Sequence, residues 1–170
     1  MNLSRRAVGI ATACFCLWAG GFNDGVSADP NFSCTLDGTS VMAFGTYDTM
    51  SNAHLDAQGQ VSYRCSPHGG SGSSNSGNGP LTVRISLSTG GAGTFNRRMQ
   101  GDRDLLHYNL YTDAQRTTVW GDGTGGTVEY TQRAQPNNKV ETIPVFGRVF
   151  GGQDVGAGQY LDNVVVTLHF

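Results

Sequence analysis

Four histidines and four cysteines are the residues with which this chain could bind a metal ion or carry out nucleophilic chemistry. The histidines are scattered, and no two stand at the spacing of zinc ligands: they are His54, His68, His107 and His169. No serine lies in a Gly-x-Ser-x-Gly elbow, and nothing singles out two carboxylates as a glycosidase pair. We therefore expect a protein that is not an enzyme and that holds no metal or other cofactor.

A glycine-rich hexapeptide at residues 121–126 formally matches the dinucleotide-binding fingerprint, because its glycines have the required spacing. That fingerprint works where a helix follows, since the helix N-terminus binds the pyrophosphate. Residues 127–131 (Thr-Val-Glu-Tyr-Thr) instead alternate in polarity and are rich in β-branched side chains, which favours a strand. A calcium loop would need several oxygen ligands, and the hexapeptide has one acidic residue. We interpret it as a turn after Trp120 that binds no nucleotide.

The first 28 residues have the pattern of an export signal. Arg5 and Arg6 give a positive start, residues 7–18 form an apolar run of 12, and residues 26–28 (Val-Ser-Ala) resemble a cleavage site. The run is too short to span a bilayer, which needs about 20 apolar residues. We expect residues 1–28 to be a signal peptide and residues 29–170 one exported domain, found outside the cell or on its surface. A retained N-terminal anchor is the alternative.

Removal of the signal would leave two cysteines, Cys34 and Cys65, in an oxidising compartment. Their simplest arrangement there is one disulfide. Closing a loop of about 30 residues should contribute roughly 3–4 kcal/mol on the chain-entropy model. Two free, buried thiols are the alternative.

The charge of the expected mature chain argues against nucleic acid as a partner. Without residues 1–28, nine basic and twelve acidic side chains remain, a net charge of about −3. Such a chain has no basic stripe for phosphate groups.

The apolar residues of the expected mature domain recur with a period of two, the period of a strand. The alternation is clearest at residues 61–65, 81–87, 106–110 and 164–170. A further strand is expected at residues 140–149, with Pro144 at an edge or bulge. Residues 66–80 are rich in glycine and serine and are expected to form a mobile, protease-sensitive loop between two strands. Short strands separated by turns are typical of an all-β sandwich or barrel.

Several segments together resemble the spore coat protein U domain, the family that includes subunits of archaic chaperone–usher pili. Cys34 begins the resemblance, and the C-terminal strand completes it. In between, the matching segments are residues 44–48, 55–59, 61–65, 83–88, 98–99, 106–113, 119–124, 147–149 and 155–162. They follow one another in order over essentially the whole mature chain.

The resemblance implies an immunoglobulin-like β-sandwich that lacks its last strand and is completed by donor-strand exchange. It also implies three kinds of partner: a periplasmic chaperone, an outer-membrane usher and neighbouring pilus subunits. The final strand would form the rim of the donor-strand and chaperone groove, with Val164, Val166, Leu168 and Phe170 facing the core or the groove. The chain also ends within a predicted strand, whose bare apolar edge would aggregate unless another strand paired with it.

The function expected from this resemblance is that of a structural or adhesive subunit of an extracellular pilus or coat. Only residues 29–33 would precede Cys34, and five residues span about 17 Å, too little for a donor strand. The subunit would then accept a strand and donate none, as at a fibre tip or chain end. If cleavage falls earlier, near Ala19, a longer donor tail remains. The alternative function is that of a secreted, non-polymerising module that binds a surface or glycan.

Overall fold

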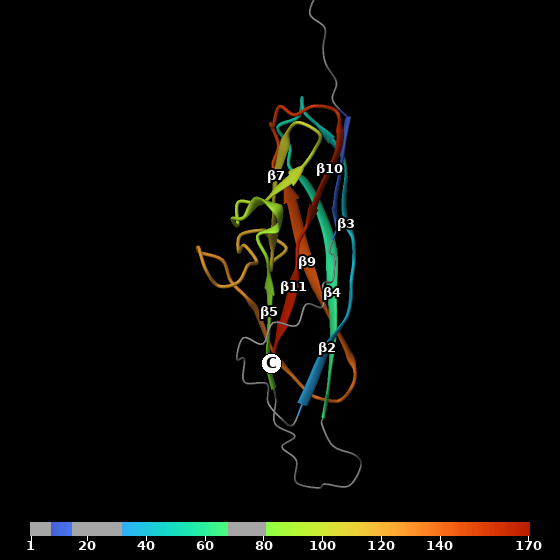
Figure 1. Ribbon diagram of the computed structural model, residues 1–170, viewed down its shortest axis with the longest axis vertical. Coiled ribbons are helices and arrows are strands. Elements are labelled where there is room, and N and C mark those ends of the chain that lie inside the picture. The colour runs from blue at the N-terminus through green and yellow to red at the C-terminus, as the bar shows by residue number, and fades with distance from the viewer. Residues whose placement is uncertain (1–7, 15–31, 68–80) are drawn as a thin grey trace, which may run out of the picture.

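Residues 8–14, 32–67 and 81–170 are described by the structure, a computed structural model built almost entirely of strands (Figure 1). The larger sheet has the strand order β2-β4-β9-β7-β6-β10-β1-β3, and the smaller has the order β11-β5-β8. The strands are β1 (Val8–Cys14), β2 (Phe32–Thr39), β3 (Met42–Asp48), β4 (Leu55–Pro67), β5 (Leu81–Leu87), β6 (Arg98–Gln100), β7 (Leu105–Tyr111), β8 (Tyr130–Ala134), β9 (Val140–Val149), β10 (Gly158–Asn163) and β11 (Val166–His169). Over the described ranges, helix is limited to one 3-10 turn, η1 (Gly90–Ala92). The prediction of an all-β fold is confirmed.

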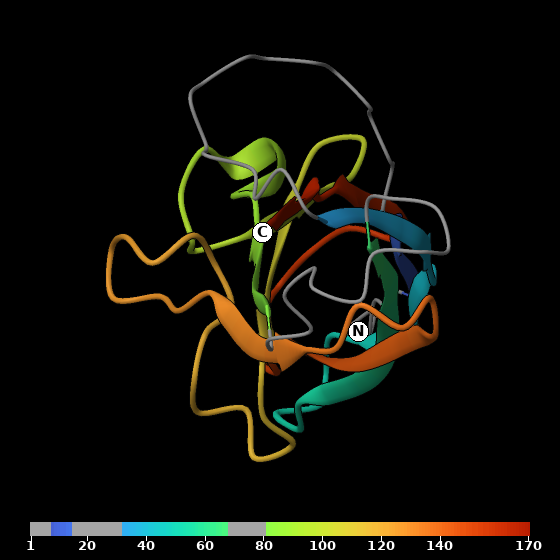
Figure 2. The ribbon, with the colours of Figure 1, turned by 90° about the horizontal axis from the view of Figure 1, so that it is seen from below.

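The large sheet curls, so that β3 at one end packs against β4 and β9 across the core. Gly147 of β9 makes this contact possible. A Cβ atom there would overlap Sδ of Met42 and would lie 2.7 Å from Cζ of Phe44. The view along the long axis shows the strands arranged around this core (Figure 2). The two ends of the large sheet therefore lie in opposite layers of a sandwich.

The interior follows the predicted alternation most clearly in β5. Val83, Ile85 and Leu87 are buried and Arg84 is exposed. Burial of apolar side chains on one face of a strand supplies about 25 cal/mol for each Å² removed from water. The largest buried residues of the rest of the core are Met42, Tyr47, Tyr63, Met99, Leu106, Tyr108, Leu110, Trp120 and Ile143.

Pro144 lies within β9, whose bounds agree with the predicted strand at residues 140–149. The strand itself lies between β4 and β7, but its ladder with β7 covers only residues 146–149. At Pro144, β9 is paired with β4 alone, through Gln60. Because a proline lacks an N–H group, it is tolerated where one side of the strand is unpaired.

The strand predicted at residues 164–170 is shorter in the structure, where β11 spans Val166–His169 and belongs to the smaller sheet. β10 ends at Asn163 in the large sheet, and β11 begins at Val166 in the small one. The chain changes sheets beside Ser88: the N–H of Ser88 donates to the carbonyl of Val165, and the N–H of Val165 donates to Oγ of Ser88, both at 2.9 Å. These bonds fix the crossing, which alternation alone does not predict.

A disulfide joins Cys34 and Cys65, the pairing predicted from the sequence. The two residues lie directly opposite each other on β2 and β4. The bridge therefore fixes β2 at one end of the large sheet. Most of the predicted mobile loop, residues 68–80, lies outside the described residues, whereas Ser66 and Pro67 belong to β4.

Candidate functional site

β1 occupies the position between β10 and β3, and we call this position the strand slot. β1 runs parallel to β10, from Gly9 opposite Gly158 to Cys14 opposite Asn163. It runs antiparallel to β3, from Val8 opposite Asp48 to Ala13 opposite Met42. The backbone of residues 8–14 thus joins two strands that are not otherwise paired with each other (Figure 1).

The strand in the slot comes from the segment that the sequence predicts to be a cleaved signal. Without residues 8–14, β3 would be paired with no other strand of the described chain, and β10 would keep only its short contact with β6. Strand edges expose unpaired N–H and C=O groups that readily pair with another chain. The slot can therefore accept one extended segment, whichever chain supplies it.

A bulge in β3 shapes the wall of the slot. Ala11 is opposite Gly45 and Thr12 is opposite Ala43, so Phe44 is the additional residue. Gly45 has φ of +85°, which is favourable for glycine and costly for a side chain with Cβ. The bulge shifts the alternation, and as a result Met42, Phe44 and Tyr47 are all buried. The ring of Phe44 meets that of Tyr108 edge to face, with centroids 6.0 Å apart.

β11 and β2 continue the line of β10 and β3 at the other end of the domain. β11 is paired only with β5, and β2 only with β4, among the described strands. The unpaired edges of β11 and β2 approach each other, as the lower part of Figure 1 shows. This edge of the sandwich extends the slot toward the C-terminus.

The four residues predicted to line the groove all lie on the inner side of this C-terminal segment. Val164 and Val166 are buried, and Leu168 and Phe170 are half-buried against the core. The alternate residues Val165 and Thr167 are exposed. The four residues thus form one apolar row that starts in the core and ends at the edge beside β2.

Asp162 is an important residue of the slot that the sequence analysis did not single out. It lies on β10 and is buried. Its Oδ1 accepts bonds from the N–H groups of Gly91 and Asn163, both at 2.8 Å. Its Oδ2 accepts a bond from the hydroxyl of Tyr108 at 2.7 Å. The sequence does contain a clue to its role: Asp162 is an acidic residue at an inward-facing position of the alternation, between Tyr160 and Val164.

The glycine-rich hexapeptide is a turn, and no helix follows it. Trp120 before the turn forms an isolated bridge with Val128 after it. Over residues 8–14, 32–67 and 81–170, no group of three or more potential metal-binding side chains comes together. In the same residues, no helix is long and apolar enough to cross a membrane.

A family model matches most of the chain. The model of the Spore Coat Protein U domain matches residues 23–167. Protein U of Myxococcus xanthus is 36% identical over 76 residues, which are 44% of this chain and 40% of Protein U. The chain thus spans well under half of that curated relative.

Comparison with solved structures supports the same fold. A chain of the CsuC–CsuE chaperone–tip adhesion subunit pre-assembly complex from archaic chaperone–usher Csu pili of Acinetobacter baumannii superimposes with a TM-score of 0.51. The sequence identity is 20%, and the match covers 82% of this chain and 40% of that one. At this identity the likeness concerns the fold.

Proposed function

Because the chain belongs to the Spore Coat Protein U domain family, we propose that it is a structural or adhesive subunit of an extracellular pilus or coat. It is exported to the periplasm, assembled by a chaperone–usher pathway and presented at the cell surface. The observation that carries this proposal is β1, a separate seven-residue strand that fills the slot between β10 and β3.

Export would remove β1 from the slot, because residues 8–14 belong to the expected signal peptide. The mature domain would then lack one strand between β3 and β10. A periplasmic chaperone would supply that strand first, and a neighbouring subunit would replace it during assembly at the usher. In such strand addition, main-chain bonds give affinity and alternate side chains give specificity.

The place of the subunit in a fibre depends on where the signal is cleaved. Cleavage after Ala28 leaves five residues before Cys34, and the subunit accepts a strand without donating one. That property suits a tip or a chain end. Cleavage near Ala19 leaves a tail long enough to fill the slot of another subunit, which suits an internal position.

The second candidate function is a self-contained surface- or glycan-binding module. The pairing of β1 with β10 and β3 also favours this function, because residues 8–14 complete the sheet within one chain. If these residues are retained after export, β3 and β10 stay paired and no donor strand is required.

The deciding experiment uses the chain recovered from the periplasm. Its N-terminus is sequenced, and its melting temperature is measured with a synthetic peptide of residues 8–13 and with a scrambled peptide. We expect a start near Asp29 or Ala19, low stability alone, and a dose-dependent rise with the matching peptide, because a ligand of the native state stabilises it. A monomer of high, reversible stability that responds to neither peptide would contradict the pilus subunit and favour the self-contained module.

A further inference from the structure

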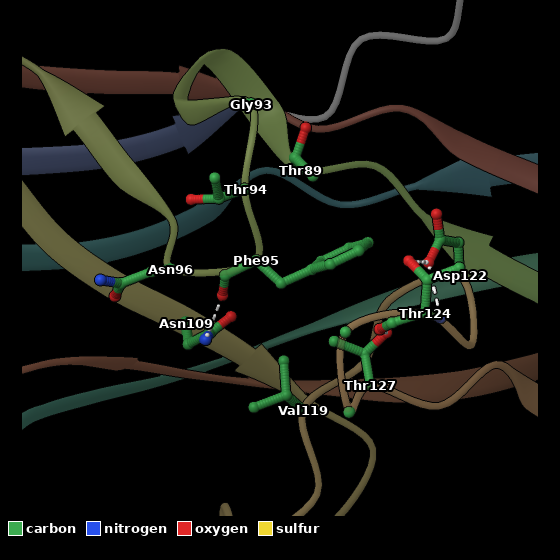
Figure 3. Close-up of a pocket in the computed structure, with 12 residues that line it drawn as sticks. Thr89, Gly93, Thr94, Phe95, Asn96, Asn109, Val119, Asp122, Thr124 and Thr127 are labelled. Atoms are coloured by element: carbon green, nitrogen blue, oxygen red, sulfur yellow. Dashed lines mark hydrogen bonds between the residues drawn. The ribbon is translucent and has the colours of Figure 1, made fainter.

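An open pocket of about 630 Å³ lies between the loop after β5 and the turn before β8 (Figure 3). Its volume is within the range of small-molecule sites. Phe95 projects across it toward the turn that carries Asp122 and Thr124. The pocket is separate from the slot, since these loops project on the side away from β3 in both views of the domain (Figures 1 and 2).

Thr94 and Asn96 line the pocket and are exposed, but their side chains extend in the direction opposite to the ring of Phe95 (Figure 3). Toward the tip of the ring, Oδ1 of Asp122 accepts bonds from the N–H and the hydroxyl of Thr124, at 2.9 and 2.6 Å. Those bonds hold the pKa of Asp122 below its usual value, and Oδ2 keeps acceptor capacity for a ligand. The pocket thus offers an aromatic ring beside a carboxylate and a hydroxyl group (Figure 3).

The two walls of the pocket are held together by Arg97, which is fully buried. Its guanidinium donates to the carbonyl of Ser88 in one wall at 2.7 Å and to that of Trp120 in the other at 2.9 Å. It also donates to Oδ1 of Asn109 at 2.8 Å, and Nδ2 of Asn109 donates to the carbonyl of Phe95 at 2.8 Å. A charge-assisted network of this kind fixes the loops before any ligand arrives.

The ring of Phe95 is fixed in the same way. Cζ of Arg97 lies 5.1 Å from its centroid. Gly121 lies against its edge, and a Cβ atom at this position would come within 2.7 Å of Cε1 of the ring. The half-buried ring presents its remaining surface to the pocket.

We propose that this pocket binds a neutral sugar unit of a surface glycan. The C–H groups of a sugar ring suit the electron-rich face of Phe95, and its hydroxyl groups suit the Asp122 carboxylate and the Thr124 hydroxyl. A neutral ligand fits the local charge, because the Asp122 carboxylate interacts electrostatically with the Arg97 cation. An open pocket binds weakly, and many copies along a fibre would raise the total avidity. Binding at this pocket does not require polymerisation, so its test is independent of the test of the strand slot.

The test is a titration of the full exported chain, followed by NMR of its backbone amides. The probes are the methyl glycosides of glucose, galactose, mannose and N-acetylglucosamine, up to about 10 mM, which covers weak affinities, with N-acetylneuraminic acid as the charged probe. We expect at least one neutral glycoside to shift the resonances of residues 94–96 and 122–127. Shifts confined to other residues, no shift at all, or binding of the acidic sugar alone would overturn the proposal.

Variants then separate binding from folding. Thr124→Ala should weaken binding three- to ten-fold, the loss of about one hydrogen bond, whereas Asn96→Ala should bind normally, because the Asn96 side chain extends away from the Phe95 ring (Figure 3). Phe95→Leu keeps an apolar side chain and removes the ring, and it should weaken binding at least as much. Gln58→Ala, which removes an exposed amide on β4, is the matched control and should bind normally. Unchanged binding by Thr124→Ala and Phe95→Leu would overturn the assignment of the pocket.

Discussion

The hydroxyl of Tyr108 donates a 2.7 Å hydrogen bond to Oδ2 of Asp162, and both side chains are buried. Tyr108 lies on β7 and Asp162 on β10, two strands with β6 between them in the sheet. Burial and the neighbouring carboxylate raise the pKa of Tyr108, so the phenol keeps its proton. This bond fixes the strand that forms one wall of the slot.

Tyr108→Phe should therefore destabilise the domain. The substitution leaves Oδ2 of a buried carboxylate without its donor, which costs about 1–3 kcal/mol of unfolding free energy. Urea denaturation of the exported chain measures the loss. The ring is retained, so an unchanged midpoint would show that the bond contributes nothing to the fold.

Tyr63→Phe is the matched substitution with the opposite expectation. The hydroxyl of Tyr63 is buried and has no hydrogen-bond partner among the described residues. Its burial without a partner is unfavourable by about 1–3 kcal/mol on protein mutational scales, so removing it should leave stability equal or higher. A loss as large as that of Tyr108→Phe would mean that Tyr63 has a partner in solution.

The raised pKa of Tyr63 also predicts that stability changes at alkaline pH. Burial, followed by repulsion from Glu141, raises the pKa of Tyr63 to about 12. In the unfolded chain the phenol ionises near pH 10. Ionisation therefore favours the unfolded chain, and the unfolding free energy is unaffected by this phenol below pH 10 and falls as the pH rises toward 12. Unfolding free energies across this range should fall less steeply for Tyr63→Phe than for the unchanged chain, whereas equal slopes would contradict the assigned pKa.

The disulfide gives a prediction that depends on β2 and β4. Cys34 and Cys65 are directly opposite each other, so unreduced exported protein should show a mass deficit of about 2 Da for the one bridge. Replacing both with serine should lower the unfolding free energy by roughly 3 kcal/mol, because the unfolded chain regains the freedom of the open loop. Labelling of both thiols without reductant would contradict the bridge.

Alternation in the sequence predicted which side chains would be buried, but not which strands would be neighbours. β5 and β9 agree with the predicted segments because period two depends on local geometry alone. The step from β10 to β11 could not be predicted in this way, since it is fixed by bonds between Ser88 and Val165, 77 residues apart. The disulfide was predictable because only Cys34 and Cys65 lie outside the expected signal peptide.

The polar interior was also beyond the sequence analysis. Arg97 lies in a loop between β5 and β6, where an arginine is ordinarily exposed. It is buried because carbonyls of separate segments, among them Ser88 and Trp120, converge on its guanidinium. By alternation Asn109 of β7 should face outward, yet its side chain is buried beneath the same loop. Such contacts depend on loop paths that no periodicity encodes.

The C-terminal strand provides a prediction about the edge of the sandwich that continues the slot. In β11, Leu168 is opposite Ile85, and residues 167–169 pair with residues 84–86 of β5. Deleting residues 167–170 removes this pairing, together with the half-buried side chains of Leu168 and Phe170. Full burial of an apolar side chain contributes about 1.5–3 kcal/mol, so two half-buried ones contribute roughly that amount together. The lost pairing adds to it, against a total of about 5–15 kcal/mol for a typical domain.

We therefore expect the truncated chain to be degraded in the periplasm. Phe170→Ala separates the side chain from the backbone pairing, and Thr167→Ala, at an exposed position of the same strand, is its control. Phe170→Ala should lower both the periplasmic level and the yield of a chaperone complex, because Phe170 lies at the edge where a donor strand would pass beside β2. Thr167→Ala should change neither. If Phe170→Ala lowers stability but chaperone capture per folded molecule stays normal, Phe170 is a core residue only, and the chaperone contacts the slot nearer to β10.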